Sequence, residues 1–113
     1  MSVTIWHNPR CSKSRRALSI IQDQGIEPEV VEYLKSPPSV AELKALAELL
    51  GTGPDSFIRK GEKTYKELEL KGSDDQTLFA AMSGNPILIE RAIVFANGKA
   101  IVARPPEDVV QIL

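Results

Sequence analysis

The beginning of the chain carries the pattern of a strand, a helix and a second strand, and this pattern constrains the fold most. Residues 3–6 form a short β-branched run that Asn8-Pro9 ends, which is typical of a strand. Apolar side chains then recur at helical spacing over residues 11–24, as far as Gly25. Residues 29–33 predict a second strand. A helix between two strands this close together predicts a parallel pair with a right-handed crossover.

The middle of the chain predicts helices. Ser39 and Glu42 have the spacing of a capping box, which opens a helix. Ser73 and Gln76 have the same spacing ahead of a further helix. Residues 53–72, which lie between the two helices, predict short helices and loops.

The end of the chain predicts a β-hairpin and a short helix. Asn97-Gly98 separates two apolar runs, residues 93–95 and 100–102, and this dipeptide is a strong hairpin signal. A short helix is expected after Pro105-Pro106. The whole order of elements predicts an α/β protein with a thioredoxin-like fold and a helical insertion. We expect residues 1–113 to form a single domain.

The composition argues against several classes of protein. A net charge of -1 over 113 residues gives no basic excess, so nucleic acid is not the expected partner. One cysteine and one histidine rule out an internal disulfide and leave too few soft ligands for structural zinc. No apolar run has the length of a membrane-spanning helix, and the N-terminus lacks the basic start of a signal peptide. We therefore expect a cytoplasmic protein that binds neither metal nor membrane.

The chain's one cysteine, Cys11, lies where the first strand is expected to end and the helix to begin. Lys13, Arg15 and Arg16 follow within five positions, and His7 precedes it by four. A helix N-terminus and neighbouring cations favour the thiolate, which is the reactive form of cysteine. A buried structural cysteine is the alternative, because free cysteine is among the most buried residue types. We favour a reactive thiol, because an inert core cysteine has little use for basic neighbours.

A lone thiolate cannot close its own disulfide. Ser14 stands where a Cys-x-x-Cys redox motif has its second thiol, so a redox cycle needs an outside thiol such as glutathione or glutaredoxin. The Ser14 hydroxyl either donates a hydrogen bond to the sulfur or binds the backbone, and both alternatives stay open. An oxyanion is the other expected reactant, because guanidinium groups bind tetrahedral oxyanions. Arg91 and Arg104 flank the expected hairpin, where the alternative for each is a solvated surface charge.

The motif around Cys11 closely resembles the active site of the glutaredoxin-coupled, ArsC-type arsenate reductases. It consists of His7-Asn8-Pro9-Arg10-Cys11-Ser12-Lys13-Ser14-Arg15. Further blocks extend the resemblance along nearly the whole chain: Gly25-Ile26-Glu27-Pro28, Tyr33-Leu34-Lys35-Ser36-Pro37-Pro38, Ile58-Arg59-Lys60, Tyr65-Lys66-Glu67-Leu68, Asn85-Pro86-Ile87-Leu88-Ile89-Glu90-Arg91 and Arg104-Pro105. Their combination in this order is more specific than any single motif.

The resemblance implies a mechanism and a set of site residues. Cys11 would be the nucleophile that attacks arsenate, and three arginines would hold the arsenic oxyanion: Arg59, Arg91 and Arg104. Glutathione would then act as co-substrate and form a mixed disulfide on Cys11, which glutaredoxin resolves as arsenite is released. Three further residues would support the thiolate: His7, Ser14 and Arg15. No tightly bound cofactor and no metal are implied, and a monomer is expected.

The sequence departs from the family at one position. Ala92 follows Arg91, where the family usually has a proline with a cis peptide bond. A cis bond before a residue other than proline costs about 2.5–4 kcal/mol, so we expect a trans bond here. We therefore expect Arg91 to be displaced or more mobile than in the family, which would weaken oxyanion binding.

Two other functions compete with arsenate reduction. The first is a glutathione-dependent thiol reductase of the same family that acts on another substrate, an alternative that Ala92 leaves open. The second is a regulator that binds RNA polymerase, like the Spx proteins that share the fold. Those regulators often use a two-cysteine switch, whose second position here is Ser14. The presence of Arg59, Arg91 and Arg104 together favours the enzyme.

Overall fold

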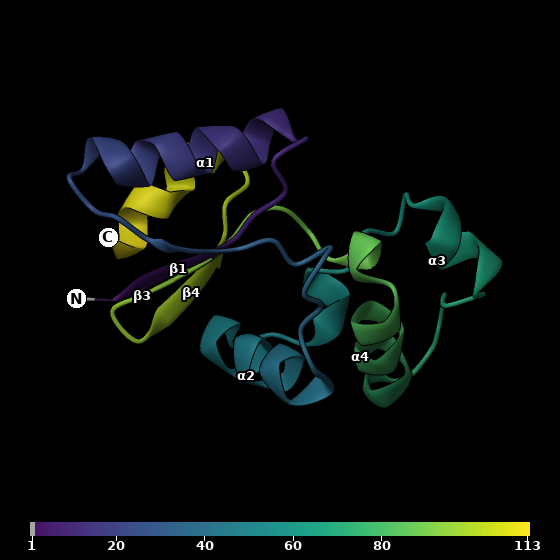
Figure 1. Ribbon diagram of the computed structural model, residues 1–113. Helices are drawn as coiled ribbons and strands as arrows, with labels where there is room; N and C mark the ends of the chain where they lie inside the picture. Colours follow the sequence, from purple (N-terminus) through teal and green to yellow (C-terminus); the bar gives the residue numbers. More distant parts are fainter. Residues whose placement is uncertain (1) are drawn as a thin grey trace. The chain divides into compact units, whose positions relative to one another are not determined.

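The computed structural model of the chain describes residues 2–113 and divides into two compact units. The first unit runs to Ser36 and resumes at Arg91, and the second consists of Pro37–Glu90. Figure 1 labels the elements of both units. No helix within residues 2–113 has the length and apolar character that crossing a membrane requires.

The first unit is built on a four-stranded sheet in the order β2-β1-β3-β4. Its elements are β1 (Val3–Trp6), α1 (Ser12–Asp23), β2 (Glu29–Val31), β3 (Ile93–Ala96), β4 (Lys99–Val102) and the 3₁₀-helix η3 (Pro106–Ile112). β1 and β2 are parallel, with Ile5 opposite Val30, whereas β3 is antiparallel to both β1 and β4. The predicted βαβ unit and the predicted hairpin are therefore confirmed.

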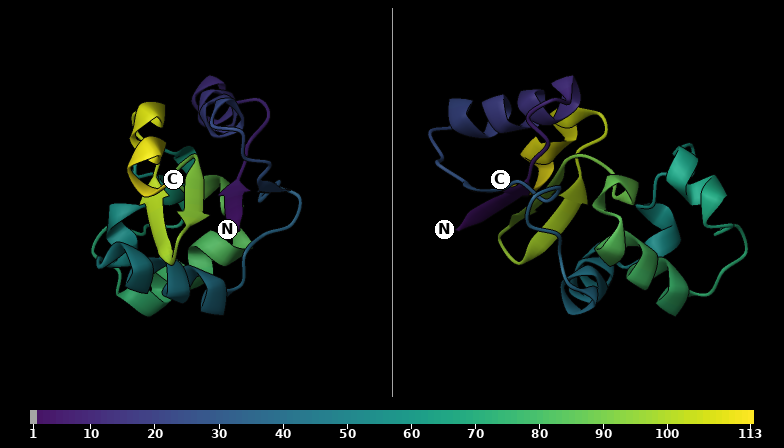
Figure 2. Two further views of the ribbon diagram at one scale, coloured as in Figure 1. Left: turned by 90° about the vertical axis from the view of Figure 1, so that its left-hand side faces the viewer. Right: turned by 45° about the vertical axis from the view of Figure 1, so that its right-hand side comes forward.

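One face of this sheet is covered by α1 and η3, which lie on the same side of the strands in Figures 1 and 2. Ile5 and Val94 stand opposite each other on β1 and β3 and are fully buried, together with Ile21 of α1 and Val109 of η3. Burying an aliphatic side chain of this size contributes about 1.5–3 kcal/mol. This shared core holds α1, and with it Cys11, against the sheet.

One predicted strand of the first unit is shorter in the structure, and the predicted short C-terminal helix is present. The second strand ends at Val31 and not at Tyr33, because the N–H groups of Lys35 and Ser36 both donate to the Glu32 carbonyl and form a turn. The C-terminal helix is a 3₁₀-helix. The hairpin turn itself is as expected, since Asn97 and Gly98 both have positive φ, 55° and 72°.

The second unit is helical and contains α2 (Val40–Leu50), η1 (Pro54–Ser56), α3 (Lys63–Glu67), α4 (Asp75–Gly84) and η2 (Pro86–Leu88). The capping box of α2 is confirmed: Glu42 N–H donates to Ser39 Oγ at 3.1 Å, and Ser39 N–H donates to Glu42 Oε1 at 3.0 Å. The largest side chains buried in this unit include Leu43, Phe57 and Met82.

The predicted cap of α4 is wrong by one residue. The cap is Asp74, whose Oδ1 accepts the Thr77 N–H at 2.8 Å, and not Ser73 with Gln76. A carboxylate carries a full negative charge, which the positive end of a helix stabilises more than a neutral hydroxyl. Hydrogen bonding by Thr77, first through its side chain and then through its N–H, lowers the pKa of Asp74.

Candidate active site

Cys11 lies at the N-terminal end of α1, directly before its first helical residue. The Cys11 N–H donates to the Asn8 carbonyl at 3.0 Å, and the Cys11 carbonyl accepts the first helical hydrogen bond from Arg15. The side chain is largely buried, at 8% exposure, and the first turn of α1 contains no acidic residue. This end of a helix stabilises negative charge, so the position suits a nucleophilic thiol.

A buried hydrogen-bond network joins the end of β1 to the first turn of α1. His7 Nδ1 lies 2.7 Å from Ser14 Oγ, and the Asn8 N–H donates to the same oxygen at 3.0 Å. Both side chains are buried, and Ser14 is fully so. Ser14 therefore does bind backbone, but on the loop before the helix. Ser14 follows Cys11 by three residues, so the network fixes the loop that carries the thiol.

His7 takes part in this network as a neutral ring at neutral pH. Burial lowers its pKa from 6.5, Arg15 lowers it further, and Glu32 partly opposes the shift. The ring therefore contributes a hydrogen bond to Ser14, not one of the positive charges near Cys11. Neither contact of Ser14 has a signal in the sequence. His7 lies seven residues and Asn8 six residues before Ser14, outside the helix that carries it.

Arg15 and Arg16, two of the three basic residues after Cys11, have separate partners. Arg15 Nη1 donates to the Pro9 carbonyl at 2.9 Å and so bridges the loop between β1 and α1. Arg16 pairs with Glu107 of η3 at 3.3 Å, with both side chains exposed. Lys13 is exposed. Arg15 therefore contributes both a charge and a hydrogen bond to the cysteine loop.

Arg91 and Arg104 flank the hairpin at one end of the sheet. Ala92 and Ala103, the residues inside them, are fully buried, and the Ala103 N–H donates to the Ala92 carbonyl at 2.8 Å. Trp6, the last residue of β1, stands opposite the first residue of β3. The chain therefore leaves β1 toward Cys11 at the same end of the sheet where the two arginines lie.

The expected trans bond between Arg91 and Ala92 is wrong, because the bond is cis. The Arg104–Pro105 bond is also cis. Ala92 is held in place by complete burial and by its hydrogen bond to Ala103, neither of which requires a proline ring. The displacement of Arg91 itself stays a prediction.

Arg59 belongs to the second unit, where two carboxylates hold its guanidinium group. Nη1 lies 2.7 Å from Glu62 Oε1, and Nε lies 3.8 Å from Glu90 Oε1. All three side chains are at most 22% exposed. The Arg59 N–H also donates to the Leu88 carbonyl at 2.7 Å, which aligns the segment of Arg59 with that of Glu90. Neither carboxylate was expected from the sequence, although the three-residue spacing of Arg59 and Glu62 is a signal for one of them.

The sheet order and the cysteine at its first strand–helix junction define a thioredoxin-like thiol protein. A model described as the ArsC family matches residues 6–112. The uncharacterized protein YfgD of Escherichia coli K12 is 48% identical, with 98% of this chain and 96% of the relative covered. An arsenate reductase of Neisseria meningitidis serogroup A is 46% identical, with 98% and 97% covered.

A solved structure gives the same result. The arsenate reductase from Vibrio cholerae superposes with a TM-score of 0.97 at 52% identity, covering 100% of this chain and 98% of the other. The chain therefore belongs to the ArsC family.

Proposed function

We propose that the chain is an arsenate reductase whose nucleophile is Cys11. The Cys11 thiolate attacks the pentavalent arsenic of arsenate, forms a sulfur–arsenic bond and displaces one arsenate oxygen as water. The thiol of glutathione then attacks the Cys11 sulfur. The sulfur–arsenic bond breaks, its electron pair reduces arsenic to the trivalent state, and arsenite leaves. A mixed disulfide between Cys11 and glutathione remains.

One observation carries the proposal: the chain's one cysteine lies at the N-terminal end of α1, at the end of the sheet where Arg91 and Arg104 flank the hairpin. Fixed positive charge at such a position stabilises both the thiolate and the anion that it attacks. The network of His7 and Ser14 and the contact of Arg15 with the Pro9 carbonyl support the loop in this arrangement.

Three arginines would bind the oxyanion in this proposal: Arg59, Arg91 and Arg104. Guanidinium groups match the geometry of tetrahedral oxyanions with paired hydrogen bonds. Arg59 would exchange a carboxylate partner for the oxyanion, because Glu62 now occupies its Nη1. The similarity of this chain to the arsenate reductases of Neisseria meningitidis and Vibrio cholerae supports arsenate as the substrate.

The reductant would be glutathione, with glutaredoxin as protein partner. A thiol of glutaredoxin attacks the glutathione sulfur of the mixed disulfide and returns Cys11 to the thiolate. The proposal needs this outside thiol, because Cys11 has no second cysteine to pair with. We further propose a cytoplasmic monomer that works as a single domain, in a compartment where thiols stay reduced.

The test is arsenate-dependent oxidation of NADPH in the presence of glutathione, glutaredoxin and glutathione reductase. The wild type should show it, and Cys11→Ser should show none, because no other thiol exists in the chain. Residual turnover in Cys11→Ser would refute the mechanism.

This assay, together with a measurement of glutathione uptake and a pull-down, separates the alternatives. Absence of arsenate turnover in a wild type that still takes up glutathione on Cys11 would indicate a thiol reductase of another substrate. Capture of the RNA polymerase alpha subunit, unaffected by Cys11→Ser, would indicate a regulator.

A further inference from the structure

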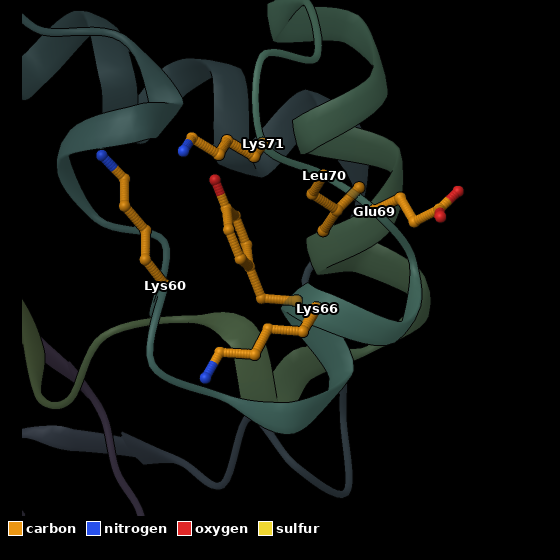
Figure 3. A pocket seen from close by; sticks show the side chains of 6 residues that line it. Lys60, Lys66, Glu69, Leu70 and Lys71 are labelled. Atoms are coloured by element: carbon orange, nitrogen blue, oxygen red, sulfur yellow. The ribbon is translucent and has the colours of Figure 1, made fainter.

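A hollow of about 360 Å³ lies on the second unit, around the end of α3 (Figure 3). Its volume falls within the range of small-molecule sites, which is roughly 300–1,000 Å³. Six side chains from one short segment line it: Lys60, Tyr65, Lys66, Glu69, Leu70 and Lys71. None of the residues assigned to arsenate reduction is among them.

The floor of the hollow is apolar and is fixed by the backbone. Tyr65 and Leu70 are buried, at 9% and 4% exposure. The Leu70 N–H donates to the Tyr65 carbonyl at 3.2 Å, and Glu69 between them has a positive φ of 52°. This turn brings the two buried residues together and leaves the polar ends of their neighbours at the rim.

The rim of the hollow is positively charged. In Figure 3 the ammonium groups of Lys60 and Lys71 point to the same side of the hollow, Lys66 lies below them, and the Glu69 carboxylate points away. Lys60 is held in place by Asp55, whose carboxylate lies 2.8 Å from its Nζ. Three lysines thus border the hollow: Asp55 compensates the charge of Lys60, Lys66 and Lys71 make the rim positive, and the lining carboxylate of Glu69 points away.

We propose that this hollow binds a small organic anion, with its carboxylate or phosphate groups at the lysine rim and its apolar part on Tyr65 and Leu70. Lysine ammonium groups are point charges that accept either kind of anion, whereas the apolar floor favours a ligand with a hydrocarbon or aromatic part. Binding at such an exposed rim is weakened by salt, because free ions screen the lysines. The site goes beyond the proposed reductase chemistry and does not depend on it.

The test is an NMR titration of the full-length wild-type chain with two probes. S-Methylglutathione offers two carboxylates and has no free thiol to react with Cys11, whereas phenyl phosphate offers a phosphate on an aromatic ring. We expect saturable shifts of the backbone amides of residues 60–71 with at least one probe. The probe that binds identifies carboxylate or phosphate as the preferred group. Inorganic phosphate should bind more weakly than phenyl phosphate, because it cannot use the apolar floor.

A matched pair of variants completes the test. Lys66→Ala with Lys71→Ala should weaken binding about twofold to thirtyfold, because each exposed charge pair contributes about 0.2–1 kcal/mol. Lys44→Ala, which removes an exposed lysine of α2 outside the hollow, should leave the affinity unchanged. The proposal is overturned if neither probe shifts residues 60–71, if Lys44→Ala weakens binding as much, or if inorganic phosphate binds as tightly as phenyl phosphate.

Discussion

His7 Nδ1 lies 2.7 Å from Ser14 Oγ, and this buried contact ties the end of the first strand to the helix that Cys11 begins. The Asn8 N–H donates to the same hydroxyl oxygen. The contact therefore couples the protonation state of the one histidine to the geometry of the cysteine loop, and its consequences can be measured.

Stability should fall when His7 is forced to take up a proton. Burial lowers the pKa of folded His7 below its value of 6.5 in the unfolded chain. The unfolded chain therefore binds the proton first, and stability is full above pH 6.5 and is lost as the pH falls through and below that value. Urea unfolding of the wild type from about pH 7.5 to about pH 5.5 should show this decrease.

The control for this prediction is His7→Asn, whose amide can still hydrogen bond near the Nδ1 position but does not titrate. Because the chain has one histidine, this variant should have a flatter stability profile over the same interval. A wild-type stability that is constant or rises on acidification would contradict the assignment of His7 as neutral.

Removing the Ser14 hydroxyl should destabilise the protein. Ser14→Ala leaves the buried His7 ring and the Asn8 N–H without their shared partner, and an unsatisfied buried polar group costs about 1–3 kcal/mol. Ser12→Ala, an exposed change on the same turn, should stay within about 0.5 kcal/mol of wild type. Equal losses in the two variants, measured by urea unfolding, would show that the network is not what stabilises this turn.

Neutralising Glu62 should strengthen arsenate binding, if Arg59 holds the oxyanion as proposed. Glu62→Gln keeps an oxygen acceptor for Arg59 but removes the charge that competes with arsenate for the guanidinium group. We expect the KM for arsenate to fall about twofold to fivefold, as for a pair worth about 0.5–1 kcal/mol. Glu67→Gln, whose carboxylate pairs with Lys63 on α3, is the control. A KM that rises in Glu62→Gln would indicate that Glu62 only positions Arg59.

The two candidate caps of α4 can be told apart by mutation. Asp74→Ala removes the acceptor of the Thr77 N–H and should lower the urea midpoint at neutral pH. Ser73→Ala should leave the midpoint nearly unchanged, because the Ser73 hydroxyl is not the cap. The difference should shrink in acid, since protonation of Asp74 weakens the cap. A larger effect from Ser73→Ala would restore the cap expected from the sequence.

The elements that the sequence predicted well are those with local causes. Val3–Trp6 is a strand, Ser39 and Glu42 form their capping box, and Asn97-Gly98 turns the hairpin. Each of these signals lies within a few residues of the structure that it specifies. The predicted cap of α4 was wrong because a local signal cannot choose between the adjacent candidates Ser73 and Asp74. Only the final geometry selects one of them.

The geometry of the candidate site could be predicted from the sequence only in part. Cys11 was placed correctly at the start of a helix, since a strand, a turn and a helical period announce that junction. The partners of Ser14 and Arg59 were not foreseen, because His7 and Glu90 reach them only after separate segments have packed. The bond between Arg91 and Ala92 was expected to be trans, because an isolated peptide unit before a residue other than proline prefers trans. In the structure this bond is cis.

The sequence by itself determined the order of the elements, the thiol at the first strand–helix junction and the need for an outside reductant. These follow from periodicity, turn residues and the count of one cysteine. Tertiary structure alone decided which polar groups from separate segments meet: Ser14 with His7 and Asn8, and Arg59 with Glu90. The reason is physical, because a hydrogen bond acts over about 3 Å, and only the packed core brings residues from distant segments within that distance.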